Sequence, residues 1–281
     1  MSAVRELRRG RLSWLELDNL RACGVRHGFT QRYGGTSRGA FSSLNFTSRQ
    51  GDEPGRVLEN WRRLEAAAAL SPRRWALVSQ VHGTAVVRAG TGRDACHHRS
   101  GCSAADALVT SSREVTLGIL TADCLAVILA APDGGAVAAV HAGWKGTLAG
   151  IAPRALRSLA GGDGTGVKAG LGPCIGRCCY EVGDEVHERF REKWGKEYVG
   201  KVFRRRRGWR LDLQKANLLQ LLEAGVKEKD IAAVPLCTSC RRDLFFSHRR
   251  DGERTGRMLA FAVPKDFREQ EEERWAETGR R

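Results

Sequence analysis

The chain has 281 residues, of which 42% are hydrophobic, so it is long enough to bury the core of one large domain or two small ones. Its formal net charge is +15, and 38 of its 47 basic residues are arginines. No stretch approaches the roughly 18 to 20 uncharged apolar residues of a membrane span, and the first residues lack the apolar segment typical of a secretory signal. We therefore expect a cytoplasmic protein whose nine cysteines are ligands, nucleophiles or buried thiols rather than disulfides.

The positive charge is compatible with two kinds of surface. In an arginine-rich chain it is often only a solvated surface, and the alternative is binding of a nucleic acid or another polyanion. The densest run, Arg204 to Arg207, is accompanied by no nucleic-acid recognition motif. We therefore expect small phosphate-bearing molecules, rather than nucleic acid, as partners of the basic surface.

Apolar patterning predicts a mixture of helices and strands along the chain. Residues 54–70 are predicted to form a helix that begins at Pro54, and residues 75–88 a strand that is irregular at 79–83. Further strands are predicted at 115–120, 125–130, 136–140, 167–171 and 258–263, and further helices at 146–159, 180–194 and 212–224. This mixture favours an α+β fold with one compact domain over a regular parallel βαβ chain.

The segment 121–144 predicts a β-hairpin that carries two reactive side chains. Its Asp133-Gly134 pair favours a two-residue type I′ turn, which needs positive φ at both central positions. That turn pairs His141 with Ala126 and leaves Cys124 two residues away on the same face. Cys124 and His141 are then diagonal neighbours, roughly 7 to 8 Å apart at Cα, and their side chains can converge.

The residues alone leave three interpretations of this pair open: a nucleophile with its base, two ligands of one metal, or two buried core residues. His82 lies at the irregular point of another strand and is the obvious third donor of a catalytic zinc, which takes three protein ligands and keeps an open position. A second group of donors, with no strand frame around it, comprises Cys96, His97, His98 and Cys102.

A further cysteine pair lies near the C-terminus of the chain. Cys237 and Cys240 have Cys-x-x-Cys spacing and, with Cys174 and Cys178, predict either a structural zinc site or a redox pair. Buried thiols after a strand are the simpler interpretation, because the sequence contains no second clean Cys-x-x-Cys motif.

Motifs in a fixed order connect the hairpin to a known family. They are His27-Gly28-Phe29, Ser43-Leu44-Asn45, Gln80-Val81-His82-Gly83, Ala105-Asp106-Ala107-Leu108-Val109-Thr110, Thr121-Ala122-Asp123-Cys124, His141-Ala142-Gly143-Trp144, Leu171-Gly172-Pro173-Cys174-Ile175-Gly176, Phe245-Phe246-Ser247-His248-Arg249-Arg250-Asp251-Gly252 and Thr255-Gly256-Arg257. Over residues 24–263 the chain resembles the YfiH-like family. Its members are also called laccase-domain or polyphenol oxidase proteins and multifunctional purine nucleoside phosphorylases.

The resemblance implies a fold and a domain organisation. The family fold is a single layered α/β sandwich with mixed, largely antiparallel sheets. Applied to this chain, it places the catalytic domain at residues 24–265, after an N-terminal lead-in of residues 1–23. Residues 266–281 are charged throughout and are expected to be a solvated tail.

The resemblance also implies a cofactor and activities. In this family the residues that match His82, Cys124 and His141 hold zinc. Copper is the family's other metal, but the seven histidines of this chain include no His-x-His pair, so we expect zinc. The implied reaction is phosphorolysis of adenosine, inosine, guanosine or methylthioadenosine to the base and a pentose 1-phosphate, with deamination of adenosine as a second activity.

Polar residues beside these motifs are candidates for substrate contacts and proton transfer. Arginine suits phosphate because its planar fork matches the phosphate oxygens. The candidate substrate-binding residues are Arg32, Asn45, Gln80, Lys145 and Arg249, and Asp106 is a supporting polar group. Asp123 is a candidate to accept or orient a proton, which gives a catalytic set of His82, Asp123, Cys124 and His141.

Two alternatives come from different classes of protein. The first is a cysteine hydrolase, or an enzyme that edits peptidoglycan precursors, in which Cys124 and His141 form a metal-free dyad. The second is a nucleic-acid-binding module that uses the basic surface. The sequence contains neither the His-x-Glu and Pro-Cys-x-x-Cys signature of cytidine-type deaminases nor a P-loop.

Overall fold

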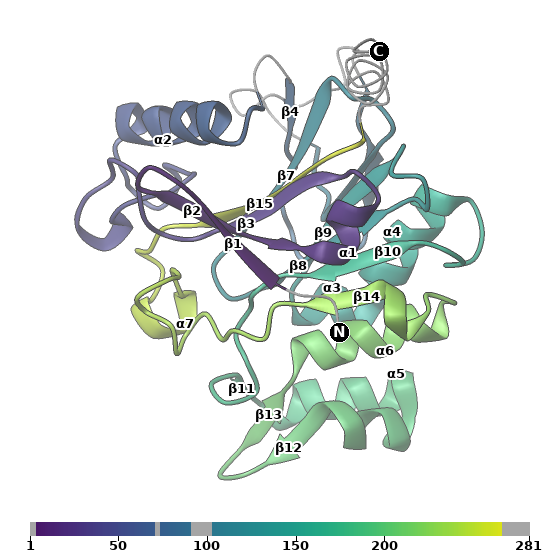
Figure 1. Ribbon diagram of the computed structural model, residues 1–281. Coiled ribbons are helices and arrows are strands. Elements are labelled where there is room, and N and C mark those ends of the chain that lie inside the picture. The colour runs from purple at the N-terminus through teal and green to yellow at the C-terminus, as the bar shows by residue number, and fades with distance from the viewer. Residues whose placement is uncertain (1–3, 71–73, 91–102, 266–281) are drawn as a thin grey trace, which may run out of the picture.

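The computed structural model describes residues 4–70, 74–90 and 103–265. Within these residues two six-stranded sheets pack face to face, with helices on both outer faces (Figure 1). Most neighbouring strands are antiparallel, and three pairs are parallel. The expected α+β fold, a layered sandwich of mixed and largely antiparallel sheets, is confirmed.

The first sheet contains the first and last strands of the described chain. Its order is β1 (Val4–Arg9), β2 (Leu12–Leu17), β3 (Arg26–Thr30), β15 (Met258–Val263), β7 (Val115–Thr121) and β4 (Arg74–Ala76). Helix α2 (Pro54–Ala67) covers its outer face, where Trp61 and Leu64 pack against Trp75 and Phe261. Although β1 and β2 precede residue 24, they pair within this sheet; the domain boundary at that residue stays a prediction.

The second sheet packs against the inner face of the first and has helices on its own outer face. Its order is β14 (Ile231–Ala233), β10 (Lys168–Leu171), β8 (Leu125–Ala130), β9 (Val137–Ala142), β6 (Ala107–Thr110) and β5 (Val86–Arg88). The covering helices are α3 (Trp144–Ala149), α4 (Ile151–Ala160) and α6 (Leu213–Glu223). Shorter helical segments are α1 (Asp18–Ala22), η1 (Gly39–Phe41), η2 (Glu228–Asp230) and α7 (His248–Asp251).

Strands β8 and β9 are buried on both faces because they lie in the middle of these layers. Leu125, Val127 and Leu129 of β8 pack toward the helices, whereas Ala126 and Ile128 pack toward the first sheet. Two-sided burial explains why the sequence of this hairpin is almost continuously apolar. Since alternate residues share a face, Cys124 lies on the side that faces the first sheet.

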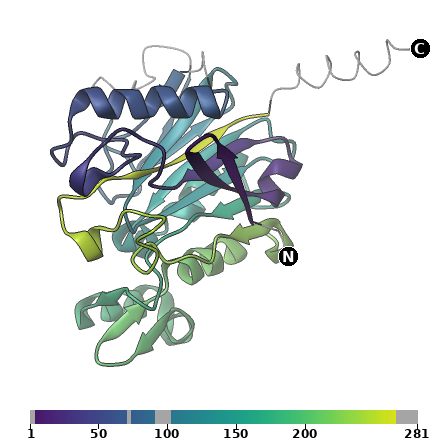
Figure 2. The same ribbon diagram turned by 60° about the vertical axis from the view of Figure 1, so that its left-hand side comes forward.

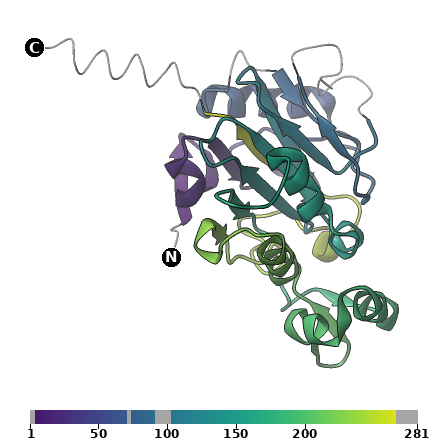
Figure 3. The ribbon, with the colours of Figure 1, turned by 90° about the vertical axis from the view of Figure 1, so that its right-hand side faces the viewer.

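A smaller lobe extends below the two main sheets in Figures 2 and 3. It contains α5 (Asp184–Val202) and a three-stranded sheet in the order β11 (Glu181–Val182), β13 (Trp209–Leu211) and β12 (Phe203–Arg205). The helix predicted at 180–194 is therefore longer and begins later, and Gly195 interrupts it with a φ of 82°. The run Arg204 to Arg207 is exposed on β12 and the residues that follow it.

Two predicted elements are divided in the structure. The strand predicted at 75–88 is two strands, β4 and β5, which lie in different sheets, and the segment between them crosses from one sheet to the other. The helix predicted at 146–159 is α3 followed by α4, because Gly150 breaks it with a φ of 81°. Among the described residues no helix is long and apolar enough to span a membrane.

The β8–β9 hairpin has the predicted register and a different turn. Ala126 pairs with His141, as the sequence predicts. The predicted type I′ turn at Asp133-Gly134 is wrong, because the N–H of Gly134 closes a turn whose central residues are Pro132 and Asp133. Proline fixes a negative φ and favours the first central position of a type I turn. Within this turn only Gly134 has positive φ, at 77°.

Candidate metal centre

Three predicted donors converge at one end of the β8–β9 hairpin. Cys124 directly precedes β8, His141 lies in β9, and His82 comes from the segment that crosses between the sheets. Their donor atoms all lie within 4.8 Å of one another. The Sγ of Cys124 is 3.8 Å from Nε2 of His82, and the rings of His82 and His141 meet edge to face with centroids 4.8 Å apart.

The crossing segment is held by side chains that replace ordinary strand pairing. The carboxylate of Asp106 accepts hydrogen bonds from the backbone N–H of His82 at 2.8 Å and of Gly83 at 2.6 Å. The amide of Gln80 donates to the carbonyl of Leu120 at 2.8 Å and accepts from its N–H at 2.9 Å. His82 has a φ of 62°, and these bonds stabilise that uncommon backbone conformation.

Asp106 also orients the second histidine. Its carboxylate lies 2.8 Å from Nδ1 of His141, and both side chains are buried. A carboxylate on one ring nitrogen fixes the tautomer of a histidine and leaves the other nitrogen available as a ligand. Asp106 therefore positions two of the three donors, a larger role than the supporting one that the sequence assigned to it.

Gly143, in the motif after His141, is required by the closeness of the donors. A Cβ at this position would lie 2.8 Å from Cδ2 of His82 and 3.1 Å from Sγ of Cys124. Because the first distance is shorter than real Cβ contacts, any side chain at Gly143 would displace His82. The glycine of this motif keeps the backbone close to both donors.

The electrostatics of the pair favour ionised forms. Burial opposes ionisation of Cys124, but the neighbouring His141 and His82 outweigh it and lower the pKa of the thiol to about 6. Burial likewise opposes protonation of His141, but Cys124 and Asp106 outweigh it and raise the pKa of the imidazole to about 9. The thiolate form of Cys124 is the form that binds metals and acts as a nucleophile.

Asp123, which lines the cleft beside this pair, joins three segments of the chain. Its buried carboxylate accepts hydrogen bonds from Thr238 Oγ1 at 2.6 Å, from Ser247 Oγ at 3.0 Å and from the backbone N–H of Arg249 at 2.7 Å. Its backbone carbonyl accepts from the N–H of Ile175 at 2.8 Å. These contacts favour a positioning role for Asp123, and its proposed part in proton transfer stays a prediction.

The donors open onto a cleft of about 1040 Å³. Binding pockets for small molecules are typically ~300–1000 Å³, so this cleft is large enough for a nucleoside together with phosphate. Its apolar part includes Trp61, Leu120 and Ile175, and its cationic part includes Lys145 and Arg257. The lining therefore offers both apolar surface for a flat ring and cations for an anion.

The predicted substrate-binding residues divide into two groups. Gln80, Lys145 and Arg249 line the cleft. Asn45 is buried beneath it, where it donates to Asp52 at 2.8 Å and accepts from the N–H of Arg257 at 2.9 Å. Arg32 lies outside the cleft lining and donates to the carbonyl groups of Ser42 and Arg242.

Two cleft residues were missed as individual candidates by the sequence reasoning. Tyr180 lines the cleft and its ring lies 5.2 Å below the guanidinium of Arg249. Arg257 lines it as well, and burial lowers the pKa of its guanidinium, an effect that Cys124 and Asp123 oppose. Arg257 belongs to the Thr255-Gly256-Arg257 motif, and that motif was the sequence feature that could have marked it as a cleft residue. The donors Cys96, His97, His98 and Cys102 and the tail 266–281 lie outside the described residues.

The donor chemistry fits a metal. Two imidazoles and one thiolate are a typical set for a catalytic zinc, whose fourth position is left to water or substrate. His82 is exposed whereas His141 is buried, so the set is open on the side of His82 and the cleft. The carboxylate behind His141 supplies the outer contact that metal-bound histidines usually have.

The fold and the three-donor cleft define a layered α/β protein with a candidate metal centre at one end of its sandwich. The family described as multi-copper polyphenol oxidoreductase laccase matches residues 26–265. The chain belongs to this family, which confirms the family resemblance predicted from its motifs.

Named relatives cover nearly the whole chain. A protein of Geobacillus stearothermophilus named purine nucleoside phosphorylase YlmD is 37% identical over 88% of this chain and 93% of its own length. A protein of Escherichia coli named purine nucleoside phosphorylase YfiH is 34% identical over 88% of this chain and 95% of its own length.

Solved structures share the fold. The crystal structure of YlmD from Geobacillus stearothermophilus has a TM-score of 0.82 and 34% identity, and the match covers 94% of this chain and 100% of that one. The crystal structure of a hypothetical protein YfiH from Bacillus licheniformis has a TM-score of 0.84 and 32% identity, over 93% of this chain and 99% of that one.

Proposed function

We propose that this protein is a zinc-dependent purine nucleoside phosphorylase that works in the cytoplasm. Its substrates are phosphate and adenosine, inosine, guanosine or methylthioadenosine, and its products are the free base and a pentose 1-phosphate. Deamination of adenosine to inosine is proposed as a second activity. Relatives that carry the name purine nucleoside phosphorylase, at up to 40% identity over 84% of this chain, support the reaction class.

One observation carries this proposal. His82, Cys124 and His141 lie together on the wall of a cleft that has an apolar part and a cationic part. A purine nucleoside needs an apolar surface for its base, and phosphate needs cations. In this proposal the three donors act on the ribose and phosphate of a substrate bound in the cleft.

Zinc is favoured over copper because, in the part of the chain that the structure describes, no methionine sulfur is available to the centre. Copper centres with two histidines and one cysteine commonly have a long axial methionine. The sequence contains two methionines, Met1 and Met258. The sulfur of Met258 is buried in the core and accepts a hydrogen bond from the N–H of Phe246, so it is not available to the centre.

The chain's own residues contribute binding and orientation to phosphorolysis. In this reaction a phosphate oxygen bonds to the anomeric carbon of ribose, the bond from that carbon to the purine nitrogen breaks, and the purine leaves with the electron pair and takes up a proton. Lys145 and Arg249 bind the phosphate, and the ring of Tyr180 provides a face for the base. Asp106 keeps His141 and His82 in place throughout. When bound, zinc supplies a Lewis acid that polarises an oxygen of the substrate.

The experiment measures metal content and adenosine turnover in the same purified protein. We expect adenine to be released only in the presence of phosphate. The proposed deamination predicts that inosine also forms in the absence of phosphate. Cys124→Ala is expected to lose the metal of this centre together with turnover. Cys23→Ser is the control, because Cys23 is a buried thiol that bonds only to backbone carbonyls of α1. Full turnover in metal-free protein would contradict the proposal.

A second candidate function is favoured by one feature of the geometry. Asp106, His141 and Cys124 follow one another as acid, histidine and thiol, the arrangement of a cysteine hydrolase or of an enzyme that edits peptidoglycan precursors. This candidate predicts that activity survives a chelator and that a thiol alkylating agent stops it by modifying Cys124. Loss of turnover on chelation, restored by zinc, excludes it.

A further inference from the structure

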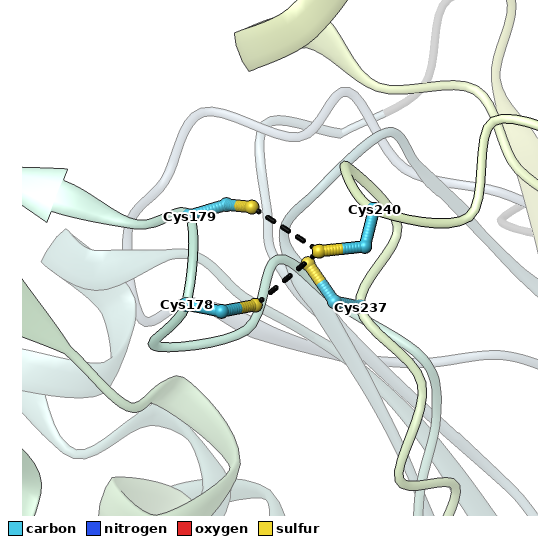
Figure 4. Close-up of side chains that lie close together, drawn as sticks. All are labelled: Cys178, Cys179, Cys237 and Cys240. Atoms are coloured by element: carbon cyan, nitrogen blue, oxygen red, sulfur yellow. Dashed lines mark hydrogen bonds between the residues drawn. The ribbon is translucent and has the colours of Figure 1, made fainter.

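A second group of sulfur donors lies outside the cleft lining. Cys178, Cys179, Cys237 and Cys240 have sulfur atoms that all lie within 4.8 Å of one another. In Figure 4 the four side chains extend toward one another from two loops. One loop leads into β11 and the other leads to α7, so the four thiols join segments that are about sixty residues apart in sequence.

The spacing of these sulfurs matches a single tetrahedral metal. Bonds of about 2.3 Å from one zinc place four thiolate sulfurs roughly 3.8 Å apart. The Sγ of Cys240 lies 3.5 Å from that of Cys178 and 3.3 Å from that of Cys179. All four side chains are free thiols, at separations well beyond the bond of about 2 Å in a disulfide.

The two loops are held in place by contacts that do not involve the sulfurs. The side-chain amide of Gln214 donates to the carbonyl of Gly172 at 2.8 Å and to that of Val234 at 2.7 Å, one in each loop. Cys174 and Cys237 form a backbone bridge between the same loops. The cluster is therefore preorganised rather than a chance approach of long side chains.

The backbone at Gly176 supports the sulfurs directly. Its N–H donates to Sγ of Cys237 at 3.2 Å, and its carbonyl accepts from the N–H of Cys179 at 2.9 Å in a tight turn. A Cβ at Gly176 would lie 3.2 Å from Sγ of Cys178, so a side chain here would crowd the donors. Amide hydrogen bonds to ligand sulfurs are a usual part of the outer contacts of metal sites.

Two arginines bond to the backbone of the cluster loops. Arg210 donates to the carbonyl of Cys178 at 2.7 Å, and Arg250 donates to the carbonyls of Thr238 and Ser239 at 2.9 and 3.0 Å. Each guanidinium also pairs with a carboxylate, Arg210 with Glu181 at 3.0 Å and Arg250 with Asp251 at 2.6 Å. These contacts fix the backbone on both sides of the cluster.

We propose that Cys178, Cys179, Cys237 and Cys240 bind a structural zinc ion, separate from the centre at His82, Cys124 and His141. Four protein ligands leave no position for substrate, so the role of this ion is to fasten the two loops. These loops carry Tyr180 toward the cleft on one side and, on the other, Thr238, which bonds to Asp123. The ion therefore connects the loop that carries Tyr180 to the loop that supports Asp123.

The test measures zinc content in variants that separate the two centres. Cys124→Ala is expected to keep one zinc ion, and Cys178→Ser combined with Cys240→Ser is expected to lose that ion in either background. Cys174→Ser is the matched control, because Cys174 lies in the same loop and its thiol bonds to the carbonyl of Ile175 rather than to the cluster. The decisive protein is the triple variant that combines Cys124→Ala with Cys178→Ser and Cys240→Ser. If it still binds one zinc ion, the proposal is overturned, whatever the cleft centre binds.

A second measurement does not depend on folding of the cysteine double variant. The Cys124→Ala protein is purified under reducing conditions. Its thiols are then titrated with an organomercurial reagent, and the zinc that is released is measured with a chromogenic chelator. We expect one zinc ion to be released as the cluster thiols react. Cobalt substitution should give the charge-transfer and intense visible bands of tetrahedral thiolate coordination. Absence of zinc and of these bands, or a disulfide within the cluster in freshly purified protein, overturns the proposal.

Discussion

The cleft centre and the four-cysteine cluster lie at the same end of the sandwich and differ in their number of donors. The cleft centre has three donors, and its outermost residue, His82, is exposed. The second cluster has four sulfur donors from two loops. A metal with three protein donors keeps a position for substrate whereas one with four does not, so the two proposed sites would have different roles, one in reaction and one in fastening loops.

The two clusters are connected by hydrogen bonds to Asp123, which is adjacent to Cys124. Its carboxylate accepts from the hydroxyl of Thr238, adjacent to Cys237, at 2.6 Å. Its backbone carbonyl accepts from the N–H of Ile175, in the loop that carries the other two cysteines, at 2.8 Å. Asp123 has a φ of 97°, an uncommon value for a residue other than glycine, and its carboxylate bonds compensate for that conformation. A loss of order in the fastening site therefore has a direct route to the cleft centre. Substitutions that affect one cluster and leave the other intact test whether the two sites are independent.

The largest effect is expected from His82→Ala. This change removes one of three donors, so we expect turnover to fall to background and the cleft centre to lose its metal. The four-cysteine cluster should keep its zinc, because His82 contributes nothing to it. Metal analysis beside an adenosine phosphorolysis assay checks both statements. Loss of all metal from the His82→Ala protein would show that the clusters are not independent.

Acid should destabilise the fold for a reason unrelated to metal. His27 is buried; its Nε2 accepts from the N–H of Leu17 at 2.9 Å, a bond that needs the neutral ring, and its Nδ1 lies 3.1 Å from the carbonyl of Val25, to which it can donate. Burial lowers the pKa of His27 from 6.5 to about 4, with a smaller contribution from Arg21. The stability that this neutral histidine contributes is therefore complete above pH 6.5 and is lost as the pH falls toward 4. The full loss is about 3 kcal/mol.

Urea unfolding of the Cys124→Ala protein at pH 7 and near pH 4 measures this loss. His27→Gln, made in the same background, should show a smaller decrease between the two pH values, because glutamine cannot titrate. An equal decrease in both proteins would mean that His27 is not the responsible group. The free energy of unfolding at each pH also shows how much protein is unfolded. Metal released from unfolded protein can then be subtracted from the acid-induced release at the two clusters.

Asp106→Asn tests the outer contacts of the cleft centre. Asparagine keeps the size of the side chain but removes the charge that faces Nδ1 of His141. Changes of this kind typically cost 10–100-fold in metal affinity or activity, and we expect a loss of about that size in both. Competition with a chelator measures the affinity, and the four-cysteine cluster serves as the internal control. Unchanged affinity would assign Asp106 to holding the backbone of His82 and Gly83 alone.

The sequence predicted the cleft centre better than it predicted the turn that frames it. The register was derived from a two-residue turn at Asp133-Gly134, and it pairs Ala126 with His141 as the structure does. The turn type was wrong because Pro132 favours the first central position of a different turn. Register survived this error, since both turns connect the same residues.

Contacts between distant segments explain what the sequence could not supply. Asp106 bonds to backbone groups twenty-odd residues away and to His141 on another strand, and no local pattern encodes that geometry. The cysteine set was predicted with Cys174 in place of Cys179. The sequence reasoning did not include Cys179, because the Cys-x-x-Cys spacing on which it relied does not apply to adjacent cysteines. The tight turn at Gly176 brings both thiols to one side.

The smallest expected effect concerns the helix that joins the two loops of the four-cysteine cluster. Asp212 caps α6 by accepting from the N–H of Lys215 at 2.9 Å, and Gln214 in the first turn of that helix bonds to both loops. Asp212→Ala should cost about 1 kcal/mol of unfolding free energy, because it removes a helix cap. It should leave zinc content unchanged, whereas Gln214→Ala should weaken zinc binding at the cluster without that cap loss. Equal zinc affinity in the two variants would show that the loops hold their positions without Gln214, so that the metal itself is the main connection between them.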